Sequence, residues 1–177
     1  SEEDRVLKEA KDLLEEIERE LDEVAERNKE LNKRLTDETR KIERRVRELL
    51  RELKDKVRKV KEDRMRERLE EELEKIVREL EEASKETEKK LEEITRETRE
   101  LIKRLEDKLR KVEKELREKI DSRKLEKLEK EVREVEKRIR DILKKLEDDN
   151  RANRKRDEDI IDELRKEADR VREEIKR

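Results

Sequence analysis

Eleven polar side chains that form directed hydrogen bonds lie in or beside the apolar stripes of this sequence, and they are its best candidates for chemistry. Asn carries both donor and acceptor atoms, Ser and Thr carry a rotatable hydroxyl, and an ionised Asp only accepts. The set is therefore complementary and predicts a buried hydrogen-bond network. Its members are Asn28, Asn32, Thr36, Thr39, Ser84, Thr87, Thr95, Thr98, Asn150, Asn153 and Asp157.

Catalysis and metal binding find little support in the same residues. Asp157 is the only acid at a position of the stripe, and the chain has no His, Cys or Tyr with which it would share a proton. Glu and Asp recur at spacings of three and four, but with 59 acidic residues such coincidences are unavoidable and indicate a solvated face with weak ion pairs. We expect no enzymatic activity, no catalytic residue, no cofactor and no metal site.

The apolar residues recur with the period of an α-helix. From Ala10 to Val60 the stripe takes 14 steps, a mean of about 3.6 residues per step. Two similar stripes run from Leu69 to Leu116 and from Leu125 to Ile175. A charged fraction of 66% without aromatics is also typical of disorder, but disordered segments do not keep such a period. The sequence therefore predicts an all-α protein.

The stripe lapses at 61–64 and at 121–123, and these lapses predict three helices at about 2–61, 64–120 and 123–176. Asp63 and either Asp121 or Ser122 are good N-cap residues for the second and third helices. One uninterrupted helix is the alternative, but it would have no partner in which to bury its stripes. Gly, the usual residue just past a helix end, is absent, so the loop boundaries are less sharply defined.

Helices of nearly equal length with short connections fold back as antiparallel neighbours. We expect one domain over 1–177, an elongated up-down-up three-helix bundle with nearly straight helices. Folding back brings the polar residues together at mid-rod: Asn28 meets Thr95 or Thr98 and Asn150, and Thr39 meets Ser84 or Thr87 and Asp157. We interpret the set as a network that fixes helix register, as a buried Asn does in coiled coils. The alternatives are side chains that point to solvent and a ligand pocket.

Net charge gives no sign of a nucleic acid or membrane partner. The chain has 57 basic and 59 acidic residues, so no long-range field attracts it to an anionic polymer or surface. The basic stretch 40–61 also carries acidic residues and has no aromatic or Gln side chain to contact bases. We expect a soluble monomer that requires no partner, with an oligomer as the other possibility. No natural localisation is expected, only recombinant production in a cytoplasm.

The composition follows a rule: Gly, Pro, Cys, His, Trp, Tyr, Phe and Gln are all absent. With its near-equal helices, Leu/Ile/Val core, Glu/Lys/Arg surface and Asp121-Ser122 helix start, the whole chain resembles computationally designed helical bundles. Spectrin-type repeats are less similar, because that family is known for core Trp and scattered Gly, Gln and His. The resemblance implies a thermostable scaffold with no natural biochemical function. The alternative is a designed interaction component, either an oligomer subunit or a helix-displacement switch.

Overall fold

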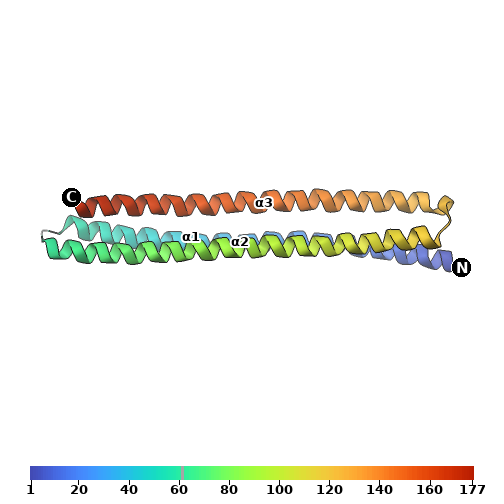
Figure 1. The fold of residues 1–177 in the computed structure, drawn as a ribbon, viewed down its shortest axis with the longest axis horizontal. Helices are drawn as coiled ribbons and strands as arrows, with labels where there is room; N and C mark the ends of the chain where they lie inside the picture. The colour runs from blue at the N-terminus through green and yellow to red at the C-terminus, as the bar shows by residue number, and fades with distance from the viewer. Residues whose placement is uncertain (61) are drawn as a thin grey trace. The chain divides into compact units, whose positions relative to one another are not determined.

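A computed structural model describes residues 1–60 and 62–177, and it consists of three long α-helices (Figure 1). The helices are α1 (Glu2–Arg58), α2 (Asp63–Lys119) and α3 (Ser122–Lys176). No strand occurs among the described residues. The prediction of an all-α three-helix fold is confirmed. The residue predicted to end the first helix, Lys61, lies outside the described residues, and α1 itself ends at Arg58.

The helix ends follow from the sequence next to them. Ser1 precedes α1, and its hydroxyl oxygen accepts a hydrogen bond of 3.3 Å from the backbone N–H of Asp4, as an N-cap residue does. Acidic residues occupy the first turn of α1 and basic residues its last turn, which matches the helix dipole. No described residue has a positive φ, so no left-handed cap closes these helices. After α1 the chain instead tightens, with bonds from Lys59 N to Lys56 O and from Val60 N to Val57 O.

The packed side chains divide into two compact units, each containing part of all three helices. Unit 1 comprises Ser1–Leu31 and Glu93–Asn150. Unit 2 comprises Asn32–Glu92 and Arg151–Arg177, except for residue 61, which lies outside the described residues. The prediction of a single domain over 1–177 stays a prediction.

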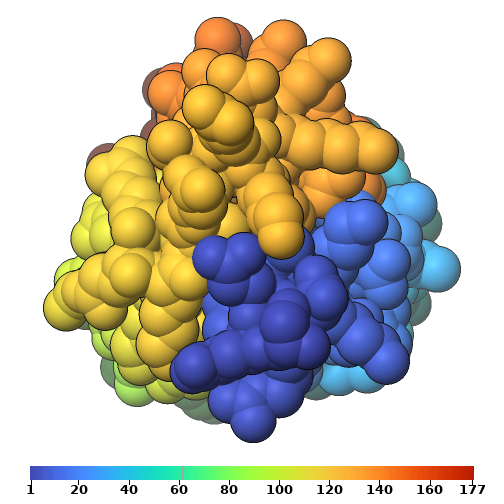
Figure 2. All heavy atoms as spheres, turned by 90° about the vertical axis from the view of Figure 1, so that its right-hand side faces the viewer, coloured from blue at the N-terminus to red at the C-terminus, as the bar shows by residue number. Residues whose placement is uncertain are grey.

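Unit 1 has a core made of aliphatic side chains from all three helices. Leu21 is completely buried, and Ile17, Ile102 and Ile139 are each 1% exposed. The α2–α3 connection at Ile120 and Asp121 lies in this unit, with the backbone N–H of Lys124 bonded to the carbonyl of Asp121 at the start of α3 (Figure 1). Figure 2 shows the start of α1 packed beside this connection, with side chains of the three helices in contact around one centre.

Ion pairs on the surface of unit 1 report the direction of its helices. Glu20 and Arg27 of α1 pair with Lys108 and Glu97 of α2, so the sequence numbers rise along one helix as they fall along the other. These two helices therefore run antiparallel. Two further ion pairs join α1 to α3 in rising order on both helices, which makes them parallel; the pairs are Glu3–Lys124 and Asp22–Arg138. This is the arrangement of an up-down-up bundle.

Unit 2 repeats the arrangement with the other halves of the helices. Leu80 and Leu164 are completely buried, and Leu50 is 1% exposed. Arg165 of α3 forms a two-pronged ion pair with Glu81 of α2, with N–O distances of 2.8 and 2.9 Å. That geometry fixes one rotational setting of the two helices more firmly than a single contact does.

Candidate functional site

The eleven polar residues predicted to form a network divide between the two units. Asn28, Thr95, Thr98 and Asn150 lie in unit 1, and the other seven lie in unit 2. Seven of the eleven are buried, namely Asn28, Thr39, Thr87, Thr98, Asn150, Asn153 and Asp157. Asn32, Thr36, Ser84 and Thr95 are half-buried. Whether all eleven act as a single network stays a prediction.

In unit 1 a single asparagine links the three helices. Asn28 of α1 is 2% exposed and accepts a 2.8 Å hydrogen bond on its side-chain oxygen from the hydroxyl of Thr98 in α2. Its side-chain NH₂ group donates a 3.0 Å hydrogen bond to the side-chain oxygen of Asn150 in α3. Both ends of the Asn28 amide are thus used, so its burial leaves neither its oxygen nor its nitrogen without a partner. Thr95 lies three residues before Thr98 on the same helix.

Unit 2 contains the same donor-acceptor sequence in a second place. The hydroxyl of Thr36 donates to the side-chain oxygen of Asn153 at 3.0 Å, and the NH₂ group of Asn153 donates to the oxygen of Asn32 at 2.7 Å. In each unit, therefore, a Thr hydroxyl donates to an Asn, and that Asn donates to a second Asn. The difference is in the helices: Thr36 and Asn32 both belong to α1, so these two bonds join α1 to α3.

Asp157 of α3 differs from the asparagines, because neither of its carboxyl oxygens has a hydrogen-bond partner among the described residues. The side chain is only 2% exposed, and burial raises the pKa of Asp157 to about 6. The positive charge of Arg156 and the neighbouring Thr39 hydroxyl both oppose that rise in pKa. However, Thr39 has a single hydroxyl proton, and this proton is donated to the carbonyl of Leu35, 3.0 Å away in its own helix. The expected meeting of Thr39 and Asp157 therefore brings the two together without satisfying the carboxyl group.

A small cavity lies between α2 and α3 at Asp157. Its volume is about 40 Å³, and its lining is mixed, with polar residues from both helices and two apolar ones: Ser84, Thr87, Glu88, Leu91, Arg154, Asp157, Glu158 and Ile161. The oxygen of Ser84 accepts a 3.4 Å bond from Arg165, the same guanidinium that holds Glu81. This bond occupies a lone pair of Ser84 and leaves its own hydroxyl proton to be donated elsewhere. The sequence predicted that Ser84 or Thr87 lies near Asp157, and both line the same cavity as Asp157.

A carboxylate pair in unit 1 escaped the sequence analysis. Glu113 of α2 lies within hydrogen-bonding distance of Glu136 of α3, and this contact, together with burial and the charge of Glu136, raises the pKa of Glu113 to about 7. Arg117 and Arg110 act in the opposite direction. Spacing along one helix gives no sign of such a pair, because its members come from different helices. Finding this pair from the sequence requires the axial offset between the antiparallel helices α2 and α3.

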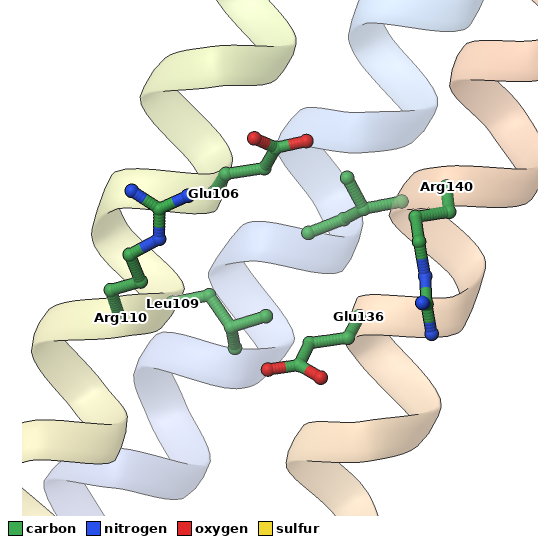
Figure 3. A pocket seen from close by; sticks show the side chains of 6 residues that line it. Glu106, Leu109, Arg110, Glu136 and Arg140 are labelled. Carbon is green, nitrogen blue, oxygen red and sulfur yellow. The ribbon is translucent and has the colours of Figure 1, made fainter.

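Glu136 also borders an open groove between α2 and α3 with a volume of about 250 Å³. Figure 3 shows Glu136 pointing from α3 towards Leu109 of α2, with Arg140 beside it on α3 and Glu106 on the facing helix. The groove has charged side chains on both rims and one apolar residue from each helix, Leu109 and Ile139.

A cluster of carboxylates would indicate a metal site, and a long apolar stretch of helix would indicate a membrane span. Nowhere in the part of the chain that the structure describes do three or more Asp or Glu side chains come together in a way that would hold a metal ion. None of the three helices described has a stretch apolar enough to cross a lipid bilayer.

Comparison with known proteins finds a designed protein among the similar structures. No protein-family model matches the sequence, and no curated protein matches it. A solved structure described as "Computationally designed three helix bundle" is similar to the chain, with 17% sequence identity, a TM-score of 0.46, and coverage of 98% of this chain and 85% of that chain. The three-helix architecture described above rests on this chain's own helices, cores and buried Asn and Thr hydrogen bonds.

Proposed function

We propose that this chain is a designed, monomeric helical scaffold without enzymatic activity, in which the buried polar side chains set the register of the helices. The support for design comes from composition: eight residue types are missing, among them His, Cys and all three aromatic residues. Selection for a natural activity gives no reason for that omission. A rule that admits only helix-forming and core-forming residues does.

The observation that carries the register role is the use of Asn28 by both neighbouring helices. Its oxygen accepts from Thr98 and its nitrogen donates to Asn150. Sliding one helix by a turn would place these polar groups against aliphatic side chains, and a buried polar group without a partner costs about 1–3 kcal/mol. Aliphatic layers are nearly interchangeable and discriminate much less between registers. The polar layer therefore disfavours the shifted arrangements more than it strengthens the correct one.

The test replaces the three linked side chains of unit 1 together: Asn28→Leu, Asn150→Leu and Thr98→Val. This exchange gives apolar burial in place of polar burial at similar volume, so the triple variant should be at least as stable as the parent towards guanidinium. It should also lose uniqueness, giving a second set of amide peaks in NMR spectra or oligomers in native mass spectra. Thr39→Val is the matched control, because the Thr39 hydroxyl donates its proton within its own helix.

Two results would contradict the register role. One is a triple variant that remains a single monomeric species with an unchanged amide spectrum. The other is a control variant that becomes heterogeneous to the same degree, since that would assign the effect to a general loss of polarity and not to bonds between helices.

A further inference from the structure

The cavity at Asp157 lies beside a buried carboxyl group that has no hydrogen-bond donor among the described residues. Two carboxyl oxygens of a side chain that is 2% exposed find no donor among the described residues, and this same side chain lines a cavity of about 40 Å³. Buried carboxylates in folded proteins are almost always hydrogen-bonded. The neighbouring Thr39 hydroxyl is engaged elsewhere, because it donates its hydrogen bond to the carbonyl of Leu35.

We propose that this cavity is a binding site for one ordered water molecule, which donates a hydrogen bond to Asp157 and connects it to α2. A water molecule needs roughly 10–15 Å³ of accessible volume, so the cavity of about 40 Å³ has enough space for the water at Asp157. Buried water molecules usually have two to four polar partners. Asp157 supplies an acceptor, while the hydroxyls of Ser84 and Thr87 supply groups that both donate and accept.

The lining also selects among possible occupants. Arg154 borders the cavity with its positive charge, which disfavours a metal cation at the carboxylate. Leu91 and Ile161 close part of the wall, and among the described residues the carboxylates of the lining do not converge in the way that a metal ion requires. An organic ligand is excluded by volume. A neutral molecule the size of water, able to donate to the carboxylate and accept from a hydroxyl, fits all of these conditions.

The site has a structural consequence in unit 2. The direct Thr36–Asn153 and Asn153–Asn32 bonds join α1 to α3. A water molecule between Asp157 of α3 and Thr87 of α2 adds a buried polar link between these helices, beside the more exposed bonds of Arg165 to Glu81 and Ser84. In unit 1 the comparable buried link is direct, because the Asn28 amide bonds to both neighbouring helices.

Water-to-protein NMR transfer on the full chain tests the proposal. Above pH 7, we expect cross-peaks between water and the methyl protons of Leu91 and Ile161, neither of which has an exchangeable side-chain proton. Thr87→Leu fills the cavity, so the variant should lose these cross-peaks while retaining the helical spectrum. It should also raise the pKa of Asp157, measured from its carboxyl ¹³C shift, because the carboxylate loses its donor. Asp159→Asn is the control, since it removes one exposed charge from the same helix without touching the cavity.

Three outcomes would overturn the proposal. The first is the absence of water cross-peaks to both methyl groups in the parent protein. The second is their persistence in the Thr87→Leu variant. The third is a dependence of the Asp157 carboxyl shift on sodium concentration that the Asp159→Asn variant retains and Thr87→Leu abolishes, which would identify the occupant as a cation. A crystal structure of the parent provides a second measurement, with a water oxygen expected about 2.6–3.2 Å from a carboxyl oxygen of Asp157.

Discussion

Replacing Asp157 with asparagine should make the stability of the chain less dependent on pH. In the folded state burial raises the pKa of this carboxyl from 3.8 to about 6. The folded chain therefore binds the proton more tightly than the unfolded chain does between these two values. The stability cost of ionising Asp157 is absent below pH 3.8, grows as the pH rises towards 6, and is complete above it. The side-chain amide of the Asp157→Asn variant does not ionise and has no such cost.

The magnitude follows from the same two values. Each pKa unit corresponds to about 1.36 kcal/mol, so the full rise is equivalent to about 3 kcal/mol. At 2% exposure the side chain itself is shielded from bulk solvent. A bound water that donates to the carboxylate would reduce this figure, which makes about 3 kcal/mol an upper bound. Of the charged groups around Asp157, Arg156 and Arg154 favour its ionised form, and Glu88 and Glu158 at the cavity rim disfavour it.

Guanidinium unfolding of the parent and the Asp157→Asn variant at about pH 3.5 and about pH 8 measures the effect. At the lower pH, the difference in free energy of unfolding between the two proteins reports the exchange of a neutral carboxyl for an amide. The change in that difference at the higher pH reports ionisation alone, and it should favour the variant by up to about 3 kcal/mol. With a denaturant slope of about 5 kcal/mol/M, the midpoint would move by about 0.6 M. Asp159→Asn should show no such change. Equal differences at both pH values would refute the reasoning.

Three further outcomes are expected. Thermal unfolding monitored by circular dichroism should have a midpoint above about 90 °C, because ideal helices with almost no loop bury continuous aliphatic layers, and a midpoint below about 70 °C would contradict this. Light scattering after size exclusion should give 22.0 kDa at every dilution, and a multiple of that mass would favour the interaction component instead. Glu113→Gln should raise the melting temperature at about pH 8 and leave it nearly unchanged at about pH 4.5, because the raised pKa of about 7 makes the Glu113–Glu136 pair destabilising once both are ionised. Glu118→Gln, an exposed change on the same helix, should have no pH-dependent effect.

The polar residues show how far sequence reasoning reaches into a site. The interruptions of the apolar stripe at Asn28 and Asn150 indicate burial, and a simple fold-back of the helices places Thr95 or Thr98 near them. The structure shows Thr98 bonded to Asn28, and Asn28 bonded to Asn150. The same reasoning brings Thr39 to Asp157 but does not reveal that the Thr39 proton is used by Leu35. The difference is physical, because a stripe fixes which face of a helix is buried, whereas a hydrogen bond depends on rotamers and on sub-ångström distances.

The sequence by itself determined that the chain is helical, where the helices break and which side of each is apolar, because all of these depend on local propensity and on the period of about 3.6 residues. Only the tertiary structure decided which donor meets which acceptor. It left Asp157 without a partner beside a cavity, brought Glu113 against Glu136, and aligned Arg165 with Glu81. These contacts join residues of different helices, and their existence depends on axial offset and rotation between helices, quantities that the packing of the cores sets and that no single helix contains.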